Sequence, residues 1–232
     1  MKTLILIPAR AGSKGLVGKN TKLLGKLPLI AYSILFAKKI AREGDVICIS
    51  TNDIDVVKIA AQYKLPVPFI RPEELASDTA GSYEVIMHAL DYYEQQGLHF
   101  DAILLLQPTS PFREMEDFRN MSSLYSNDCD MVVSVNISKN NPYFNLFEQD
   151  EQGYLKKSKE STSYRRQDCP DVFAFNGSMY LMNSASLKRT NIQGFTKIIK
   201  SIMPDERSID IDNMKDWKIA EYFLKQTISE NS

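Results

Sequence analysis

The stretch Leu4-Ile5-Leu6-Ile7, followed directly by Pro8-Ala9-Arg10-Ala11-Gly12, decides the fold that this chain is expected to adopt. Four consecutive aliphatic residues predict a strand that is buried on both faces, because a half-exposed strand would alternate apolar and polar side chains. Similar short apolar runs occur at 46–49, 102–106 and 131–133. The chain is therefore expected to contain a set of strands that are covered on both sides.

Longer amphipathic stretches separate these runs. They have the apolar spacing of surface helices and span 30–41, 54–63, 83–93 and 117–125. Strands that alternate with helices indicate parallel strands joined by crossover helices. We predict an α/β fold with a Rossmann-like, doubly wound, mostly parallel sheet. Later elements are expected as strands at 178–181 and 198–202 and a last helix from 214 to about 226.

The alternation stops between residues 140 and 171. This segment has few aliphatic residues and a turn at Gln149–Gly153, and it is rich in aromatics: Tyr143, Phe144, Phe147, Tyr154 and Tyr164. It cannot form a core of its own, so a β-hairpin arm inserted into a single domain (1–232) is expected instead of a second domain.

The composition excludes several classes of protein. With 232 residues, 44% hydrophobic, and a net charge of -1, the chain has no global basic field for sequence-independent nucleic-acid binding. Three scattered cysteines, never as CxxC, and two histidines argue against a disulfide framework, a cysteine-rich zinc site or a histidine-based metal site. The apolar run 4–7 is too short to cross a membrane or to act as a signal peptide, so a cytoplasmic protein is expected.

The loop after the first predicted strand carries the strongest signal for a ligand. Glycines recur at every third position (Gly12, Gly15 and Gly18), and three cations lie among them: Arg10, Lys14 and Lys19. Ligands bind at the carboxyl ends of strands in doubly wound sheets, and such a loop suits a polyphosphate. The spacing fits neither a Walker A loop nor a GxGxxG dinucleotide fingerprint. A solvated basic surface loop is the alternative.

The segment Ala9–Gly15, with Lys19 and Asn20 a few residues on, resembles the signature loop of the acylneuraminate cytidylyltransferases, also called CMP-sialic acid synthetases. Further blocks resemble this family and occur in the family order: Ser50–Asp53, Arg71–Asp78, Gln107–Pro111, Arg165–Asp168, Asn176–Ser178 and Ser208–Asp212. The resemblance implies transfer of CMP from CTP to the anomeric hydroxyl of a nine-carbon 2-keto sugar acid of the sialic or legionaminic type. It also implies dependence on Mg²⁺, release of pyrophosphate and a homodimer.

The resemblance also implies roles for individual residues. Lys19 is expected to be the cation nearest the transition state, with Arg165, Arg166 and Asp212 as further catalytic residues. The expected nucleotide-binding residues are Arg10, Ala11, Gly12, Ser13, Lys14, Asn20, Arg71, Ala80, Ser82 and Gln107. The expected sugar-binding residues are Gln107, Arg166, Asn176, Tyr180 and Phe195. For Tyr180 and Phe195, a place in the core is the alternative.

Asp210 and Asp212 are the expected Mg²⁺ ligands. The polar-apolar alternation of 208–211 predicts a strand, which would place both carboxylates on one side. Asp212 could instead cap the helix that begins at Met214. A rival pair, Asp53 and Asp55, is interpreted as structural, because it lies where a helix begins.

Some family features and alternatives remain open. The sugar's carboxylate calls for a guanidinium, and Arg165 and Arg166 fit that need. The family's acceptor-contacting lysine near Phe144 and Asn145 is absent, which leaves the identity of the sugar open. The resemblance also implies that the 140–171 arm reaches across a dimer. A CMP-Kdo synthetase, a GT-A glycosyltransferase that uses Asp210 and Asp212 as its DxD motif, and a non-catalytic nucleotide sensor are the alternative functions.

Overall fold

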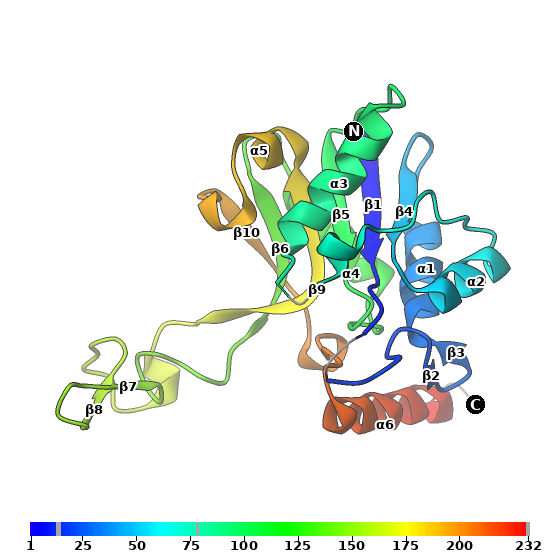
Figure 1. Ribbon diagram of the computed structural model, residues 1–232. Coiled ribbons are helices and arrows are strands. Elements are labelled where there is room, and N and C mark those ends of the chain that lie inside the picture. The colour runs from blue at the N-terminus through cyan, green and yellow to red at the C-terminus, as the bar shows by residue number, and fades with distance from the viewer. Residues whose placement is uncertain (13–14, 78, 231–232) are drawn as a thin grey trace.

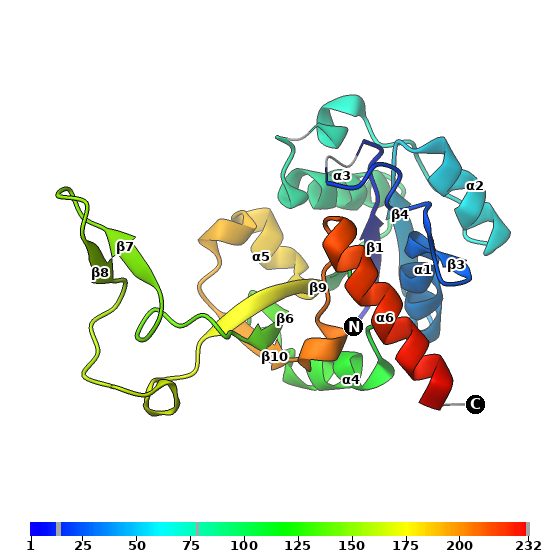
Figure 2. The ribbon, with the colours of Figure 1, turned by 90° about the horizontal axis from the view of Figure 1, so that it is seen from below.

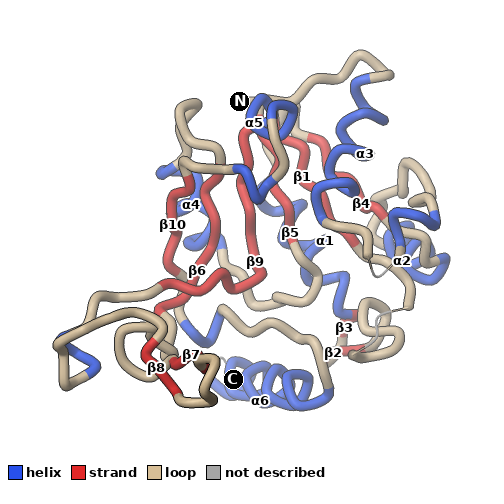
Figure 3. The backbone as a smooth tube through the Cα atoms, turned by 60° about the vertical axis from the view of Figure 1, so that its left-hand side comes forward, coloured by secondary structure: helices blue, strands red, loops and turns tan. Residues whose placement is uncertain are grey.

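The computed structural model describes residues 1–12, 15–77 and 79–230, with the side chains of 227–230 left out of the description. At its centre lies a six-stranded sheet with the strand order β10-β6-β9-β5-β1-β4 (Figures 1 and 3). The strands are β1 (Thr3–Pro8), β4 (Val46–Ser50), β5 (Ala102–Leu106), β6 (Met131–Ile137), β9 (Phe173–Asn183) and β10 (Ile198–Ile202). Each predicted apolar run is a strand of this sheet.

Strand directions confirm the mostly parallel sheet. β1 pairs in parallel with both β4 and β5, with Leu4 opposite Val46 and Ile103. β10 pairs in parallel with β6. β9 runs antiparallel between β5 and β6, a feature that the sequence did not indicate. Since both neighbours of β9 oppose it, β5 and β6 run in the same direction, and the carboxyl ends of β1, β5 and β6 meet at one edge.

Helices cover both faces of the sheet, as the continuous apolar strands predict. On one face lie α1 (Leu29–Ile40), α2 (Ile54–Gln62) and α4 (Met115–Leu124), which share a core with Ile5, Ile7 and Leu104. The other face is covered by α3 (Ser82–Glu94) and by the short α5 (Ser184–Arg189), which share a core with Leu4, Leu6 and Leu105. The sequence did not predict α5.

The last helix, α6 (Met214–Glu230), lies below the sheet, at the edge where β1 ends (Figures 1 and 2). Its fully buried Trp217 shares a separate apolar cluster with Leu24 and Ile211. Leu24 belongs to the small hairpin of β2 (Leu23–Leu24) and β3 (Leu27–Pro28), which follows the glycine-rich loop. This cluster holds the amino-terminal loop and the start of α6 together.

The segment 140–171 extends away from the sheet, as Figures 1 and 2 show. It contains a hairpin of β7 (Phe147–Gln149) and β8 (Leu155–Lys157), turned at Gly153 with φ +88°. Several of its large side chains face solvent; Tyr164 is 96% exposed and Tyr154 72% exposed. The predicted hairpin is confirmed, and its apolar side chains have no core of their own.

The strand expected at 208–211 is wrong. These residues form an irregular connection between a short 3-10 turn (Asp205–Arg207) and α6. Alternation of apolar and polar residues arises here because Ile209 and Ile211 pack against the Trp217 cluster, whereas Asp210 between them is exposed. No neighbouring strand pairs with this segment, so strand geometry cannot explain where Asp210 and Asp212 lie.

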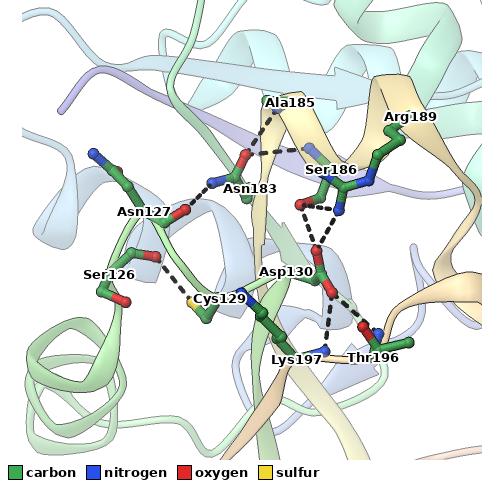
Figure 4. Close-up of polar contacts among 10 residues, drawn as sticks. All are labelled: Ser126, Asn127, Cys129, Asp130, Asn183, Ala185, Ser186, Arg189, Thr196 and Lys197. Carbon is green, nitrogen blue, oxygen red and sulfur yellow. Dashed lines mark hydrogen bonds and ion pairs between the residues drawn. The ribbon is translucent and has the colours of Figure 1, made fainter.

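Asp130 organises the edge opposite the carboxyl ends of the strands (Figure 4). The residue is 4% exposed and precedes β6. One carboxylate oxygen accepts hydrogen bonds from Ser186 Oγ (2.6 Å) and Arg189 Nη2 (2.8 Å), and the other from the backbone N–H groups of Thr196 (3.0 Å) and Lys197 (2.9 Å). These contacts join the starts of β6 and β10 to α5.

Replacement of Asp130 by Asn is expected to lower the free energy of unfolding by about 2 kcal/mol at pH 7, since an amide cannot accept four hydrogen bonds. Hydrogen bonding, above all from Ser186, lowers the pKa of Asp130 in the folded protein. Its contribution is therefore present above about pH 4 and is lost as the pH falls further. Urea unfolding at pH 7 and pH 3 measures this, and an equal difference at both values would contradict it.

Candidate active site

A pocket opens at the carboxyl ends of β1 and β5. Five of the residues that line it are predicted nucleotide-binding residues: Arg10, Arg71, Ala80, Ser82 and Gln107. Arg10 and Gln107 follow β1 and β5, Arg71 and Ala80 lie in the connection between α2 and α3, and Ser82 is the first residue of α3. The other lining residues are Pro8, Leu75, Gly81, Val85 and Leu105, which the sequence analysis missed. Val85 could have been found, since it lies one helical turn after Ser82.

Arg71 forms a rigid part of this pocket. The residue is 4% exposed, and its guanidinium donates to Ser50 Oγ (3.0 Å), to the Ser50 carbonyl and, more weakly, to the Leu75 carbonyl (3.5 Å). Burial, together with the nearby charge of Arg10, lowers the pKa of Arg71 to about 10. Two guanidinium groups close together in a pocket favour a ligand with negative charge.

The start of the glycine-rich loop is tied to neighbouring segments. Arg10 Nη1 donates to the Ala76 carbonyl (3.1 Å), and the Ala11 N–H donates to Asn52 Oδ1 (2.8 Å). Gly12 is exposed with φ +74°, a backbone conformation that favours glycine. The predicted Ser13 and Lys14 lie outside the described residues. Asn20 is 7% exposed and donates to the Arg10 carbonyl (3.3 Å), so its described contact supports the loop.

Lys19 joins the loop to the segment before α6. Its ammonium is almost buried, with the residue 8% exposed, and donates to the Ile211 carbonyl (2.7 Å) and to Asp212 Oδ1 (3.1 Å). Gly15 lies against the same segment, because a Cβ there would be 2.2 Å from the Asp212 carbonyl oxygen. The structure therefore brings the predicted Lys19 and Asp212 into contact across 193 positions of sequence.

Asp210 lies in the same region, beside Gly177. A Cβ at Gly177, which has φ +72°, would lie 2.8 Å from Asp210 Oδ2. Partial burial raises the pKa of Asp210, and repulsion by Asp212 and Asp216 acts in the same direction; a hydrogen bond with Thr109 and the charge of Lys19 oppose the rise. Asp212 contacts the Lys19 ammonium directly, whereas Asp210 and Asp216 lie close enough to influence the same group of charges.

The helix-capping alternative for Asp212 does not hold. The Asn213 side chain accepts hydrogen bonds from the N–H groups of Lys215 (2.8 Å) and Asp216 (3.2 Å). Asp216 accepts in return from the N–H groups of Asp212 (3.0 Å) and Asn213 (3.1 Å). Asn213 and Asp216 thus cap α6, and the carboxylate of Asp212 contacts Lys19 instead.

The acidic pair fits a hard divalent cation in chemistry and charge. Carboxylate oxygens are the ligands that Mg²⁺ prefers, and Mg²⁺ is usually held by one or two carboxylates together with substrate phosphates. Within the described ranges, no group of three or more His, Cys, Asp or Glu residues is placed to hold a metal ion. Two carboxylates beside a pocket with basic residues match a site that is completed by a polyphosphate.

Comparison with known proteins identifies the family. The cytidylyltransferase family profile matches residues 4–228. The chain belongs to the cytidylyltransferase family. It is 34% identical over 229 residues to the CMP-N,N'-diacetyllegionaminic acid synthase of Legionella pneumophila, with 97% of each chain covered. It is also 34% identical to the N-acylneuraminate cytidylyltransferase of Escherichia coli O18:K1:H7, where the match covers 94% of this chain and 51% of the relative.

Solved structures support the fold of this cytidylyltransferase. CMP:2-keto-3-deoxy-manno-octonic acid synthetase complexed with CTP superposes with a TM-score of 0.70 at 15% identity, covering 98% of this chain and 100% of the other. The 4-diphosphocytidyl-2C-methyl-D-erythritol synthase of Anaerococcus prevotii gives a TM-score of 0.64 at 15% identity, with 97% and 98% covered. At this identity the two likenesses concern the fold alone.

The cytidylyltransferase chain does not bring every predicted sugar-binding residue to the pocket. Asn176 is buried and bonded to the side chains of Ser134 (2.6 Å) and Ser208 (2.8 Å), which fixes it within the fold. Phe195 is 7% exposed and packs in the core with α5, in agreement with the alternative prediction that it is a core residue. Tyr180 is half-buried in β9, and burial followed by the charge of Asp210 raises its pKa, so it lies near the acidic pair.

The predicted arginines lie in the arm. Arg165 pairs with Asp168 (2.9 Å), and Arg166 donates to the Ser138 carbonyl (3.2 Å). Neither lines the pocket beside Arg10 within this chain. The rival acidic pair is structural, as expected: Asp53 caps α2 by accepting from the Asp55 N–H (2.9 Å), and Asp55 pairs with Lys58 (2.8 Å).

The division of labour at the start of α6 can be tested by two substitutions. Asn213→Ala removes the cap and is expected to lower the free energy of unfolding by about 1 kcal/mol. Asp212→Asn retains an oxygen acceptor for Lys19 and is expected to change it by less than about 0.5 kcal/mol. Urea unfolding followed by the fluorescence of Trp217, the only tryptophan, measures both. A larger loss for Asp212→Asn than for Asn213→Ala would contradict this assignment of the cap.

Proposed function

We propose that this protein transfers CMP from CTP to the anomeric hydroxyl of a nine-carbon nonulosonic acid of the sialic or legionaminic type. The observation that carries the proposal is a pocket containing Arg10, Arg71 and Gln107 next to the Lys19–Asp212 pair. The two relatives named above, a CMP-N,N'-diacetyllegionaminic acid synthase and an N-acylneuraminate cytidylyltransferase, support the acceptor class. CTP and the sugar acid are the proposed substrates.

The charges of the site support a place for each part of CTP. Arg71, Ala80, Ser82 and Gln107 would hold the base and ribose in the pocket, where the buried Arg71 offers a fixed donor. The triphosphate would extend toward the loop that carries Arg10 and Lys19. The hydrogen bond from Asn20 to the Arg10 carbonyl keeps the two parts of that loop together (3.3 Å).

In the proposed reaction the anomeric hydroxyl oxygen attacks the α-phosphorus, the bond to the β-phosphate oxygen breaks, and pyrophosphate leaves. The hydroxyl proton passes to a base or to solvent. Lys19 would stabilise negative charge on the phosphates, and its ammonium is already held by the Ile211 carbonyl and by Asp212. A cation fixed in advance does not have to reorganise during the reaction, which makes its stabilisation effective.

Asp210 and Asp212 are the proposed holders of Mg²⁺. When bound, the ion would neutralise charge on the triphosphate. The protein's own contribution is to keep the two carboxylates near each other: Gly177 leaves room for Asp210, and the cap made by Asn213 and Asp216 leaves Asp212 available.

The arm supports a homodimer of this domain (1–232). Tyr154, Leu155 and Tyr164 are at least 70% exposed on the 140–171 arm, which extends from the sheet. A second copy would bury these side chains and would bring Arg165 and Arg166 to the neighbouring site, where a guanidinium can bind the sugar carboxylate.

We place the reaction in the cytoplasm. The three cysteines are free in the structure, with Cys48 and Cys129 buried, which suits a reducing compartment. Among the described residues, no helix is long and apolar enough to cross a membrane.

The proposed activity is tested with CTP, Mg²⁺ and a panel of N-acetylneuraminic, legionaminic, pseudaminic and KDN-type acids. Pyrophosphate release is expected with at least one of them and is expected to stop when EDTA removes the metal. Lys19→Met is expected to lower kcat by about 100-fold, because it removes charge stabilisation of the transition state. The exposed Lys26→Met, from the same region, is the control. Absence of pyrophosphate with every acid would refute the proposal.

The role of the arm is tested by mixing two inactive variants. Arg166→Ala and Lys19→Met dimers are unfolded together and refolded at equal concentration. If Arg166 acts across the interface, half of the dimers contain both subunits and one intact site, so about a quarter of wild-type activity returns. Analytical ultracentrifugation follows the dimer. An active monomer, or no recovery in mixed dimers, would contradict the model of a shared site.

A further inference from the structure

Arg113 is a buried arginine that follows the pocket residue Gln107 in the connection between β5 and α4. The residue is 7% exposed. Its Nε donates to the Ser110 carbonyl (2.9 Å), and its Nη2 donates to the Ser110 carbonyl (2.6 Å), to Ser33 Oγ (2.9 Å) and to the Gln107 carbonyl. The guanidinium also lies 5.6 Å from the ring centroid of Phe36 in α1. One side chain thus fastens the 107–110 turn to α1.

This guanidinium is not explained by an ion pair. No carboxylate among the described residues lies within 4.0 Å of it. Burial lowers the pKa of Arg113 to about 9, and the more distant charge of Asp210 opposes the change. Burying a cation without a carboxylate partner costs free energy, which its hydrogen bonds must offset. A role for this arginine in holding the surrounding segments would explain why it is buried.

The turn that Arg113 fastens connects the two halves of the candidate site. At one end, Gln107 lines the pocket. At the other, the Thr109 carbonyl accepts a hydrogen bond from the Ile211 N–H (2.9 Å), and Thr109 also bonds to Asp210. The Ile211 carbonyl in turn accepts from Lys19 Nζ (2.7 Å). A shift of this turn would therefore move Gln107, the acidic segment and Lys19 together.

Ser33, which accepts a hydrogen bond from Arg113, belongs to a helix that also supports the site. Ser33 lies one turn into α1, and the first residues of this helix hold the glycine-rich loop: the N–H groups of Leu29 and Ile30 donate to the carbonyls of Lys22 and Asn20 (both 3.0 Å). α1 is thus a common support for the amino-terminal loop and, through Arg113, for the 107–110 turn.

We propose that Arg113 is a positioning residue for cytidylyl transfer, which holds the nucleotide pocket and the Lys19–Asp210–Asp212 group in one fixed relative arrangement. The inference rests on the proposed function. Arg113 does not touch substrate; it acts through the backbone carbonyls of Gln107 and Ser110. Such an arrangement lowers the barrier because the reacting groups need not be oriented anew in each turnover.

The test is Arg113→Lys, which keeps the charge but cannot reproduce the planar fork. We expect kcat to fall by about 10-fold and binding of CMP, measured by calorimetry, to weaken by about threefold, because both halves of the site lose their common support. Arg119→Lys, an exposed arginine in α4, is the matched control and should leave both values unchanged.

A second control separates positioning from loss of stability. Asp130→Asn weakens the opposite edge of the sheet, where no proposed site residue lies. Measured well below its melting temperature, this variant should keep the wild-type kcat, whereas Arg113→Lys should not. Equal kcat values for the two variants and the wild type would overturn the proposal.

If Arg113→Lys does not fold, Ser33→Ala tests the proposal instead. This substitution removes one hydrogen-bond acceptor of Arg113 and leaves the arginine in place. A loss of about two- to fivefold in kcat/KM supports the proposal, and an unchanged value overturns it. CMP binding does not require a sugar acceptor. A wild-type protein that binds CMP but releases no pyrophosphate would therefore contradict the proposed function while leaving the effect of Arg113 on nucleotide binding measurable.

Discussion

The contact between Lys19 and the segment before α6 is the interaction on which the site depends. The nearly buried ammonium of Lys19 needs oxygen atoms as hydrogen-bond acceptors. These are the Ile211 carbonyl and the Asp212 carboxylate, which lie more than 190 positions away in sequence. Ile211, whose carbonyl accepts from Lys19, also belongs to the apolar cluster with Leu24 and Trp217. Loop and acidic segment are thereby held together before any ligand arrives.

The direction of the strands explains why these segments meet at all. β1 and β5 end at the same edge, so the glycine-rich loop and the Gln107 turn emerge side by side, while Asp130 fastens the starts of β6 and β10 at the other edge. The two edges have different polar contacts: Figure 4 shows those of Asp130, whereas Lys19 contacts Asp212 at the other edge. This separation allows one edge to carry the charged groups proposed to bind ligands, while the other contributes stability.

Local patterns predicted most of the sheet, including β5 and β10 at their observed bounds, because continuous apolar runs have few alternatives to a doubly covered strand. The five predicted residues that line the pocket were instead implied by the resemblance to the acylneuraminate cytidylyltransferases. Local patterns failed where burial depends on distant partners. The alternation at 208–211 resembles that of a strand but results from packing against Trp217. Asn176 was predicted to bind the sugar, but its side chain is hydrogen-bonded to a neighbouring serine within the fold.

The sequence by itself determined most of the order of strands and helices, the basic glycine-rich loop and the family, since these depend on residue types and spacing along the chain. Only the tertiary structure decided that Asn213 rather than Asp212 caps α6, that Lys19 contacts Asp212, and that Arg113 joins the pocket to α1. A polar side chain has several possible hydrogen-bond partners along the sequence. Packing selects one of them by bringing it within about 3 Å and by removing the water that competes for the same bond.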